Sequence, residues 1–541
     1  MLSDVSDSDG NKGEQQGRML SSAAGLQARN GRPMKTRPTE RDTLRALLIL
    51  LIAATCLAAI LFNQLTLQAM EFHTRDYTYY LQFAAKLLHD RLTPHHSLNP
   101  EGFNFLGFHG IDGEAGLHQA IHIEPIKYLD AFVYALFRTP TALIVWRSLL
   151  FFAPALYFLR VFPTSTRPNR RFAALFILLY CLYPATPMAA VYDLRPFGLL
   201  APAFLATTVA ITLRRPTWEV LLAFNAMFLA REEALVLGPL LILYQIASNR
   251  QRAEPLRQRV GPLTVSWTAW VVIAALYWSW TGYPRTTAVN ILPDLTVVSR
   301  GWIVLSALSA GGALSLSLLL VRSLRRRSDG LLALTFLVLL LPLWREFLWH
   351  KRDQDLPGMI TALLYDPRWM LLVYGLLLVA LIRWQAGVSA RGRSALLGAM
   401  TAVVLLCVGL HFADEDAAFW EARAHLAKIP QTALIFEFRQ RLDPTRAHIL
   451  CDYTTHQAFY DFEYLYVYER LPAYLVPNQE RLYPANIETL TRLLREEIEY
   501  IIISRQEQAT IDDLVARAGV AARVHPLAAN DRYVILAVAR P

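Results

Sequence analysis

Charged residues are scarce in this chain. Lys, Arg, Asp and Glu make up 18% of its 541 residues, whereas apolar residues reach 54% and mean hydropathy is +0.29. An average soluble domain is about 25% charged. The shortage excludes a disordered, fibrous or ordinary cytosolic protein and favours a protein with many membrane spans. The formal net charge of +9 would suit nucleic acid only if the basic residues lay on a soluble surface.

Cysteine is also scarce, with four residues in the whole chain. Cys56, Cys181 and Cys407 fall in apolar stretches, and Cys451 stands alone near the C-terminus. No intramolecular disulfide framework is indicated.

Long apolar stretches are what the chain has in abundance. They predict about eleven transmembrane helices, with ten to twelve compatible because several stretches are shorter than the roughly 20 residues of a straight span. The stretches are Ala46–Phe62, Thr141–Leu159, Phe172–Thr186, Phe197–Leu213, Thr217–Ala230, Ala234–Ala247, Leu263–Thr281, Trp302–Val321, Leu331–Leu343, Trp369–Ile382 and Ala395–Leu410.

Basic residues alternate between the loops that join these stretches. They are concentrated before the first stretch and after the second, fourth, sixth, eighth and tenth. Because Lys and Arg in short loops stay cytoplasmic, we expect a cytoplasmic N-terminus and an external C-terminal tail.

Three regions follow from this topology. Residues 1–45 are a polar, disordered cytoplasmic leader. Residues 46–411 are the transmembrane domain, which includes a large outer loop at 63–140. Residues 412–541 carry 14 basic and 19 acidic residues, so the basic excess lies in the leader and membrane region. The +9 therefore reports orientation, and no nucleic-acid partner is expected.

The tail alternates strand-like and helix-like segments, which predicts a small α/β domain outside the membrane. Strands are expected at Ala447–Tyr453, Leu465–Tyr468, Tyr500–Ser504 and Tyr533–Val538, and helices at Ile487–Glu497 and Ile511–Ala518. The tail contains no catalytic motif, so support or acceptor binding is its expected role.

The outer loop at 63–140 holds two groups of interest. Asp76 stands at the start of an amphipathic helical pattern, where a carboxylate serves either as a helix cap or as a base or metal ligand. His118 and His122 would share one face of a helix, the spacing of paired metal ligands, although hydrogen-bonded structural histidines or phosphate contacts fit the pattern too.

Charges beside or inside the spans are the other candidates, since a charge at membrane depth usually faces a partner or a cavity. Arg147 lies inside the second predicted span. The triplet from Arg231 to Glu233 joins two short stretches, and a short outer loop carries Asp193 and Arg195. Structural ion pairs between helices are the alternative interpretation.

These groups together match the needs of a transferase that uses a sugar linked to a lipid phosphate. The acceptor hydroxyl needs a carboxylate to take its proton. The departing phosphate needs Arg, Lys, His or a metal ion to stabilise its charge.

The motifs also resemble a known family. Asp76 with Gln82, the segment from His122 to Pro125, Asp193-Leu-Arg195-Pro-Phe and Arg231-Glu-Glu-Ala are similar to motifs of the bacterial membrane family of domain of unknown function 2079, which is similar to the GT-C glycosyltransferases. The resemblance implies a GT-C-like fold in the bacterial cytoplasmic membrane, a polyprenyl-phosphate sugar donor at its outer face, and inversion at the anomeric carbon.

The resemblance also implies roles for residues. Asp76 would be the general base or a metal ligand, and Arg231 would bind the donor phosphate while the acids beside it orient it. We take Asp76, Glu232 and Glu233 as candidate catalytic residues. The substrate-binding candidates are Gln82, His122, Glu124, Asp193, Arg195 and Arg231. A divalent cation is a possible cofactor, with Asp76, His118 and His122 as its candidate ligands.

Two other classes remain open. A transporter or flippase of lipid-linked or small anionic substrates would explain charges at membrane depth equally well, but no inverted repeat is evident. A catalytically inactive structural membrane protein is the third reading.

Overall fold

The computed structural model describes residues 40–72, 76–86, 123–232, 234–250, 256–281, 371–385, 389–415, 417–452, 454–468 and 484–540. The chain divides into two compact units, Met1–Leu47 and Leu48–Pro541.

Helices make up the described chain as far as residue 439. In order they are α1 (Glu40–Ala69), α2 (Asp76–Lys86), α3 (Ile126–Phe137), α4 (Pro140–Val161), α5 (Arg167–Leu182), α6 (Thr186–Ala189), a 3-10 turn η2 (Tyr192–Leu194), α7 (Phe197–Thr212), α8 (Thr217–Ala230), α9 (Ala234–Arg250), α10 (Leu256–Thr281), α14 (Leu371–Gln385), α15 (Ala390–Ala413) and α16 (Ala418–Arg439).

Nine of the eleven predicted spans coincide with helices in the described ranges. The other two, Trp302–Val321 and Leu331–Leu343, lie outside the described residues. Among the described residues, four helical stretches are long and apolar enough to cross a membrane: Asp42–Ala69, Pro140–Val161, Arg257–Tyr277 and Ala390–Arg439. Helices α7, α8, α9 and α14 are apolar but shorter. The protein is thus a helical membrane protein, and the number of its spans stays a prediction.

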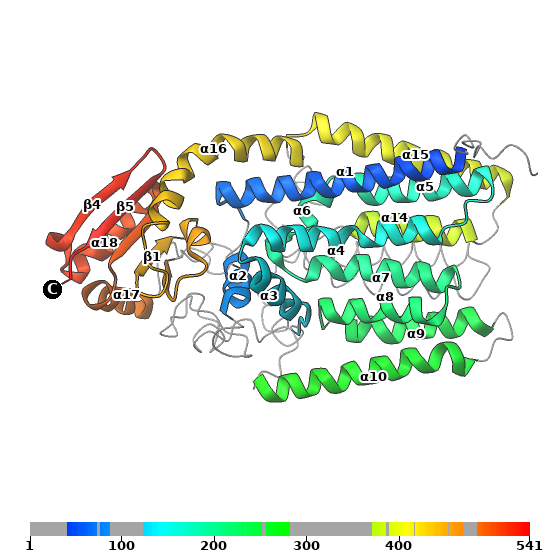
Figure 1. Ribbon diagram of the computed structural model, residues 1–541, viewed down its shortest axis with the longest axis horizontal. Coiled ribbons are helices and arrows are strands. Elements are labelled where there is room, and N and C mark those ends of the chain that lie inside the picture. The colour runs from blue at the N-terminus through cyan, green and yellow to red at the C-terminus, as the bar shows by residue number, and fades with distance from the viewer. Residues whose placement is uncertain are drawn as a thin grey trace, which may run out of the picture. The chain divides into compact units, whose positions relative to one another are not determined.

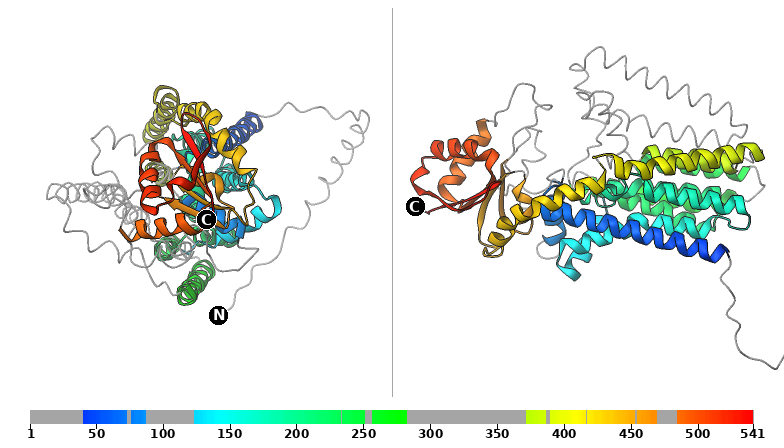
Figure 2. Two further views of the ribbon diagram at one scale, coloured as in Figure 1. Left: turned by 90° about the vertical axis from the view of Figure 1, so that its left-hand side faces the viewer. Right: turned by 90° about the horizontal axis from the view of Figure 1, so that it is seen from above.

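Helices α4, α5, α7, α14 and α15 pack side by side, as seen in Figure 1 and in the right-hand view of Figure 2. Leu50, Leu57 and Leu61 of α1 are more than half exposed. Leucines exposed to this extent along an apolar helix are expected where its surface contacts lipid.

Local capping explains where several helices begin. Thr139 accepts a hydrogen bond from the backbone N–H of Thr141, and Pro140 opens α4. Thr166 does the same for Asn169 at the start of α5, and Ser389 for Gly392 at the start of α15. Each hydroxyl satisfies a backbone N–H that has no partner within its helix.

The segment after α16 forms a five-stranded mixed sheet. Its strands are β1 (His448–Asp452), β2 (Tyr464–Tyr468), β3 (Tyr500–Ser504), β4 (Val524–Ala529) and β5 (Tyr533–Val538), in the order β2-β1-β3-β5-β4. Strand β1 is parallel to β2 and β3, whereas β5 is antiparallel to β3 and β4. The helices α17 (Pro484–Glu496) and α18 (Gln508–Ala518) and the 3-10 turns η6 (Thr455–Phe459), η7 (Arg505–Glu507) and η8 (Ala521–Arg523) complete it.

The predicted strands and helices of the tail are therefore present as a sheet with helices. The start of the domain at residue 412 and its place outside the membrane stay predictions. Strand β4 was not anticipated. It lies at the sheet edge, is largely exposed, and contains Pro526 next to a register shift, so it lacks the apolar alternation by which strands are found. Helix α16 was not anticipated either.

The tail contacts the chain that follows α1. The side-chain amide of Gln457 donates to the Phe72 carbonyl (3.0 Å) and its oxygen accepts from the Phe72 N–H (3.2 Å). Met70 belongs to the same apolar core as the sheet. The Lys428 ammonium of α16 also pairs with Glu71 at 2.7 Å.

Candidate functional site

Side chains from α2, the start of α3 and the α8–α9 junction meet at one place. The Tyr80 hydroxyl of α2 donates a hydrogen bond to Glu124 Oε2 at 2.5 Å. One residue earlier, the Ile123 N–H donates to Glu232 Oε2 at 3.0 Å, across 109 positions of sequence. Glu124 and Tyr80 are buried. The structure thus brings together Glu124 and Glu232, two predicted site residues from separate motifs.

Only one of the two carboxylate oxygens of Glu124 has a hydrogen-bond partner among the described residues. Its Oε2 accepts from Tyr80, whereas its Oε1 is buried and has no hydrogen-bond partner among the described residues. Buried polar atoms are nearly always paired with protein, water or a ligand. The free oxygen therefore marks a position where a ligand hydroxyl or water would donate a hydrogen bond.

Lys127 supplies positive charge to the same place. It lies in the first turn of α3, is buried, and its ammonium lies 5.4 Å from the centre of the Phe83 ring. Burial lowers the pKa of Lys127 to about 8, although the carboxylates of Glu124 and Glu232 raise it. The ammonium is therefore charged at neutral pH but only weakly solvated, which strengthens its attraction for an anion.

A second buried pair lies next to this group. The guanidinium of Arg147, on α4, pairs with Asp130 of α3, and Trp146 donates to the other Asp130 oxygen at 3.1 Å. Burial raises the pKa of Asp130 to about 6, against the lowering effect of Arg147. The pair links α3 to α4 by a hydrogen-bonded contact inside the protein.

Arg147 also binds the segment that carries Asp193 and Arg195. Its Nη2 donates to the Leu194 carbonyl at 3.2 Å. Leu194 has a φ of 55°, a backbone conformation that is unfavourable for a branched residue and persists only when its surroundings hold it. Arg147 of α4 thus contacts both α3 and η2. This agrees with the alternative that it forms a structural ion pair between helices.

Helix α10 contributes one tyrosine near the two carboxylates. The Tyr277 hydroxyl lies within electrostatic range of both Glu124 and Glu232. Tyrosines from two helices, Tyr80 and Tyr277, therefore accompany the two carboxylates.

The other predicted residues have different positions. Gln82 is buried, and its amide donates to the Phe462 carbonyl of the tail at 3.4 Å. Arg195 is half-buried and stacks on Tyr192 at 5.8 Å. Arg231 is half-buried and directly follows α8. Their substrate-binding roles stay predictions.

Several predicted residues lie outside the described structure. These are His118, His122 and Glu233, together with the side chains of Asp76 and Asp193. The expected helix over Asp76 is confirmed, since α2 begins at that residue. Within the described residues no group of three His, Cys, Asp or Glu could hold a metal ion. The side chains of the predicted cation ligands Asp76, His118 and His122 lie outside the described structure, so the cation site stays a prediction.

Sequence reasoning missed Tyr80, Lys127 and Asp130. The signal was present, since Lys127 and Asp130 are charged residues in an otherwise apolar helix, Ile126–Phe137. They lie three positions apart on α3, so they face the same side of the helix. Both interact electrostatically with Glu124, which stands two residues before the helix.

No protein-family model and no curated protein sequence matches the chain. Among solved structures, the crystal structure of ArnT from Cupriavidus metallidurans in the apo state aligns at 14% sequence identity with a TM-score of 0.45. The alignment covers 91% of this chain and 98% of that chain. A TM-score below 0.5 is too low to support a conclusion about this chain's fold or activity.

Proposed function

We propose that the chain is a membrane glycosyltransferase that takes its sugar from a polyprenyl-phosphate donor at the outer face of the cytoplasmic membrane. The observation that carries the proposal is the group formed by the buried Glu124, Lys127 and Tyr80 and the half-buried Glu232, beside apolar helices. The resemblance of the sequence motifs to GT-C-related proteins supports the same reaction class.

The group has the parts that such a transfer requires. An acceptor hydroxyl attacks the anomeric carbon, the bond from that carbon to the donor phosphate oxygen breaks, and the hydroxyl proton passes to a carboxylate. The free Oε1 of Glu124 is suited to receive that proton, and Asp76 is the second candidate. The Lys127 ammonium would stabilise the negative charge on the departing phosphate, with Arg231 as a further cation.

Mixed charge also explains how a buried ammonium is tolerated here. Two carboxylates surround Lys127, so a buried ammonium is not left without a counter-charge. An arriving phosphate would add negative charge next to the same ammonium and hold it in its protonated form. The tyrosines supply hydroxyl donors that orient Glu124 or a sugar hydroxyl.

The test replaces the carboxylates without changing their size. Glu124→Gln and Glu232→Gln are introduced in the host cell, and lipid-linked sugars and surface glycans are profiled together with protein level. We expect loss of one glycan modification, with its lipid-linked sugar accumulating. Glu437→Gln, at an exposed position of α16, is the matched control and should leave both profiles unchanged.

Unchanged glycans at normal protein levels in both Gln variants would refute the transferase. Movement of a labelled lipid-linked sugar across vesicle membranes without any acceptor would favour a flippase. Asp76→Asn and Arg231→Ala belong to the same series, because these positions carry the resemblance.

A further inference from the structure

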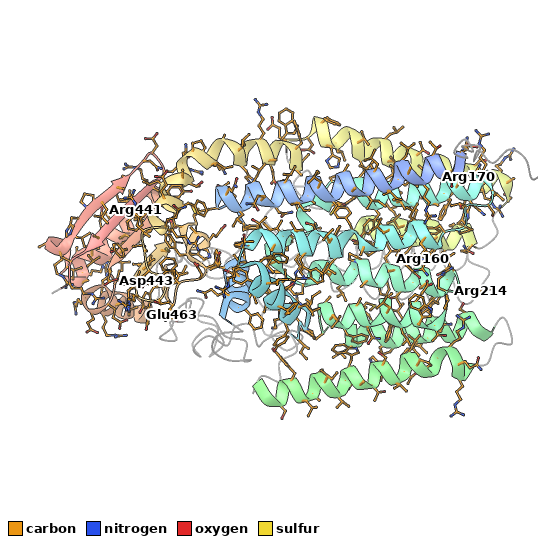
Figure 3. All side chains as sticks on the ribbon, viewed as in Figure 1. Arg160, Arg170, Arg214, Arg441, Asp443 and Glu463 are labelled. Atoms are coloured by element: carbon orange, nitrogen blue, oxygen red, sulfur yellow. The ribbon has the colours of Figure 1, made fainter. Side chains whose placement is uncertain are left out.

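A second charged cluster lies at the other ends of the same helices. Arg160 lies 13 positions after Arg147 on α4, about 20 Å further along the helix axis. Figure 3 shows Arg160, Arg170 and Arg214 together at this end of the helices. The cluster has no part in the proposed transfer reaction.

One buried carboxylate organises the cluster. Glu219 accepts from Arg215 through both of its oxygens at 2.9 Å, from Arg160 at 3.2 Å and from the Tyr157 hydroxyl at 3.1 Å. Helix α10 joins through Arg259, whose Nη1 donates to the Arg215 carbonyl at 2.7 Å. Three helices and the α7–α8 connection are thus fixed around Glu219.

The cluster nevertheless keeps a strong positive excess. We define it as Arg160, Arg214, Arg215, Arg259 and Glu219, with Trp218 beside it. The Glu219 carboxylate accepts from two of these four arginines, Arg160 and Arg215. The Arg160 side chain is 57% exposed, and Arg214 is exposed in a backbone conformation with φ of 58°. The positive charge therefore faces outward.

Exposed apolar side chains continue from the cluster along the same helix faces. Trp218 is 56% exposed and lies beneath the Arg160 guanidinium at 5.8 Å. Leu222 follows one turn after Trp218, and Leu156 precedes Arg160 by one turn; their exposed fractions are 68% and 49%. Positive charge, an indole and an apolar strip thus succeed one another along the helix axis.

We propose that this cluster binds the phosphate head group of an anionic phospholipid, whose acyl chains lie along Leu156 and Leu222. Guanidinium groups match phosphate oxygens in charge and geometry. Basic sites between transmembrane helices bind anionic lipid head groups, and tryptophan is enriched at head-group depth. The apolar strip selects a lipid over a free phosphate, which would gain nothing from Leu156 and Leu222.

The experiment uses the full chain purified in detergent and reconstituted into nanodiscs of zwitterionic lipid containing a graded fraction of phosphatidylglycerol. Bound anionic lipid is measured by native mass spectrometry and by enrichment after delipidation. The test variant is Arg160→Gln/Arg214→Gln. The control is Arg167→Gln/Arg391→Gln, which removes the same charge at exposed positions that open α5 and α15.

We expect the test variant to lose at least about fivefold in anionic-lipid enrichment and the control to change less than twofold. Equal losses in both variants would show general charge attraction, and no loss in either would show no site; both outcomes overturn the proposal.

In a separate arm, zwitterionic nanodiscs receive inorganic phosphate alone. Thermal stabilisation by phosphate equal to that by phosphatidylglycerol would identify a free-anion site and overturn the lipid assignment. Leu222→Ser, expected to weaken lipid enrichment without changing charge, keeps the proposal testable if the double variant is poorly folded.

Discussion

The two ends of helices α4, α8 and α10 handle charge in opposite ways. Near α2 and α3, positive and negative groups are nearly balanced. Buried Lys127 lies with buried Glu124 and half-buried Glu232, and buried Arg147 pairs with buried Asp130. At the other end, one buried carboxylate serves several arginines, and Arg160 and Arg214 are exposed.

The difference indicates two different partners. Burying a charge destabilises the fold unless the charge is paired. We therefore infer that the group of Lys127, Glu124 and Glu232 is kept because it binds a substrate. Exposed like charges cost little because water and salt screen them. The exposed arginines Arg160 and Arg214 are therefore suited to bind the phosphate head groups of the lipid layer.

The largest expected effect tests whether the two ends lie on opposite sides of the membrane. All four native cysteines are buried, so an introduced cysteine reports alone. Ser165→Cys, between α4 and α5, and Ala516→Cys, on α18, are both at exposed positions. A membrane-impermeant maleimide should label Ala516→Cys on intact cells, and Ser165→Cys only after permeabilisation. The reverse pattern would invert the predicted orientation, and the unmodified protein is the control.

The buried pair gives the next effect. Arg147→Met leaves the Asp130 carboxylate buried without its partner and should lower the free energy of unfolding by about 3–5 kcal/mol. Arg160→Gln, which removes an exposed arginine from the same helix, should cost less than about 1 kcal/mol. Denaturant titration in detergent measures both.

The double variant Arg147→Met/Asp130→Asn sharpens this result. It removes both charges, so it should be more stable than Arg147→Met alone. A double variant as unstable as the sum of two single losses would mean that the pair does not act as a unit.

The sequence predicted the helices well where hydropathy alone decides. Thr217–Ala230 was predicted with the bounds that α8 has, and the strands at Tyr500–Ser504 and Tyr533–Val538 coincide with β3 and β5. Arg231 follows the first of these apolar runs and Arg505 follows the second. Strand β4 lacked such a run because an exposed edge strand buries little.

The site was predicted only in part, for a physical reason. Glu124 and Glu232 were singled out by motif and charge, but their proximity depends on how α3 packs against the α8–α9 junction. Lys127 and Asp130 were overlooked because their partners are distant in the sequence. Asp130 pairs with Arg147 of α4, and Lys127 interacts with Glu232 at the α8–α9 junction.

Lys127 provides a pH test of the balanced group. Its pKa of about 8 in the folded protein lies below the usual 10.5, so the unfolded chain binds more protons between these values and stability should rise with pH there. Binding of an anion should change in the opposite sense, because it needs the ammonium. Under the proposed function, the dissociation constant for a short-chain prenyl monophosphate should rise about tenfold per pH unit above pH 8.

Two variants of Lys127 separate charge from packing. Lys127→Arg keeps its proton to high pH, so its binding should stay flat between pH 7 and 9.5. Lys127→Met should bind weakly at every pH. Isothermal titration measures all three proteins, and a wild-type affinity that does not change across this range would contradict the role given to Lys127.

The smallest expected effect is at the exposed cluster. Glu219→Gln removes the charge that gathers Arg160 and Arg215, yet both arginines reach solvent, so the loss of unfolding free energy should be about 1 kcal/mol. Because the loss is electrostatic and partly exposed, it should shrink as salt rises from about 0.05 to 0.5 M. The loss in Arg147→Met should persist over the same range, since salt does not screen a buried pair. If the two losses respond to salt alike, the two ends do not differ in the way their burial indicates.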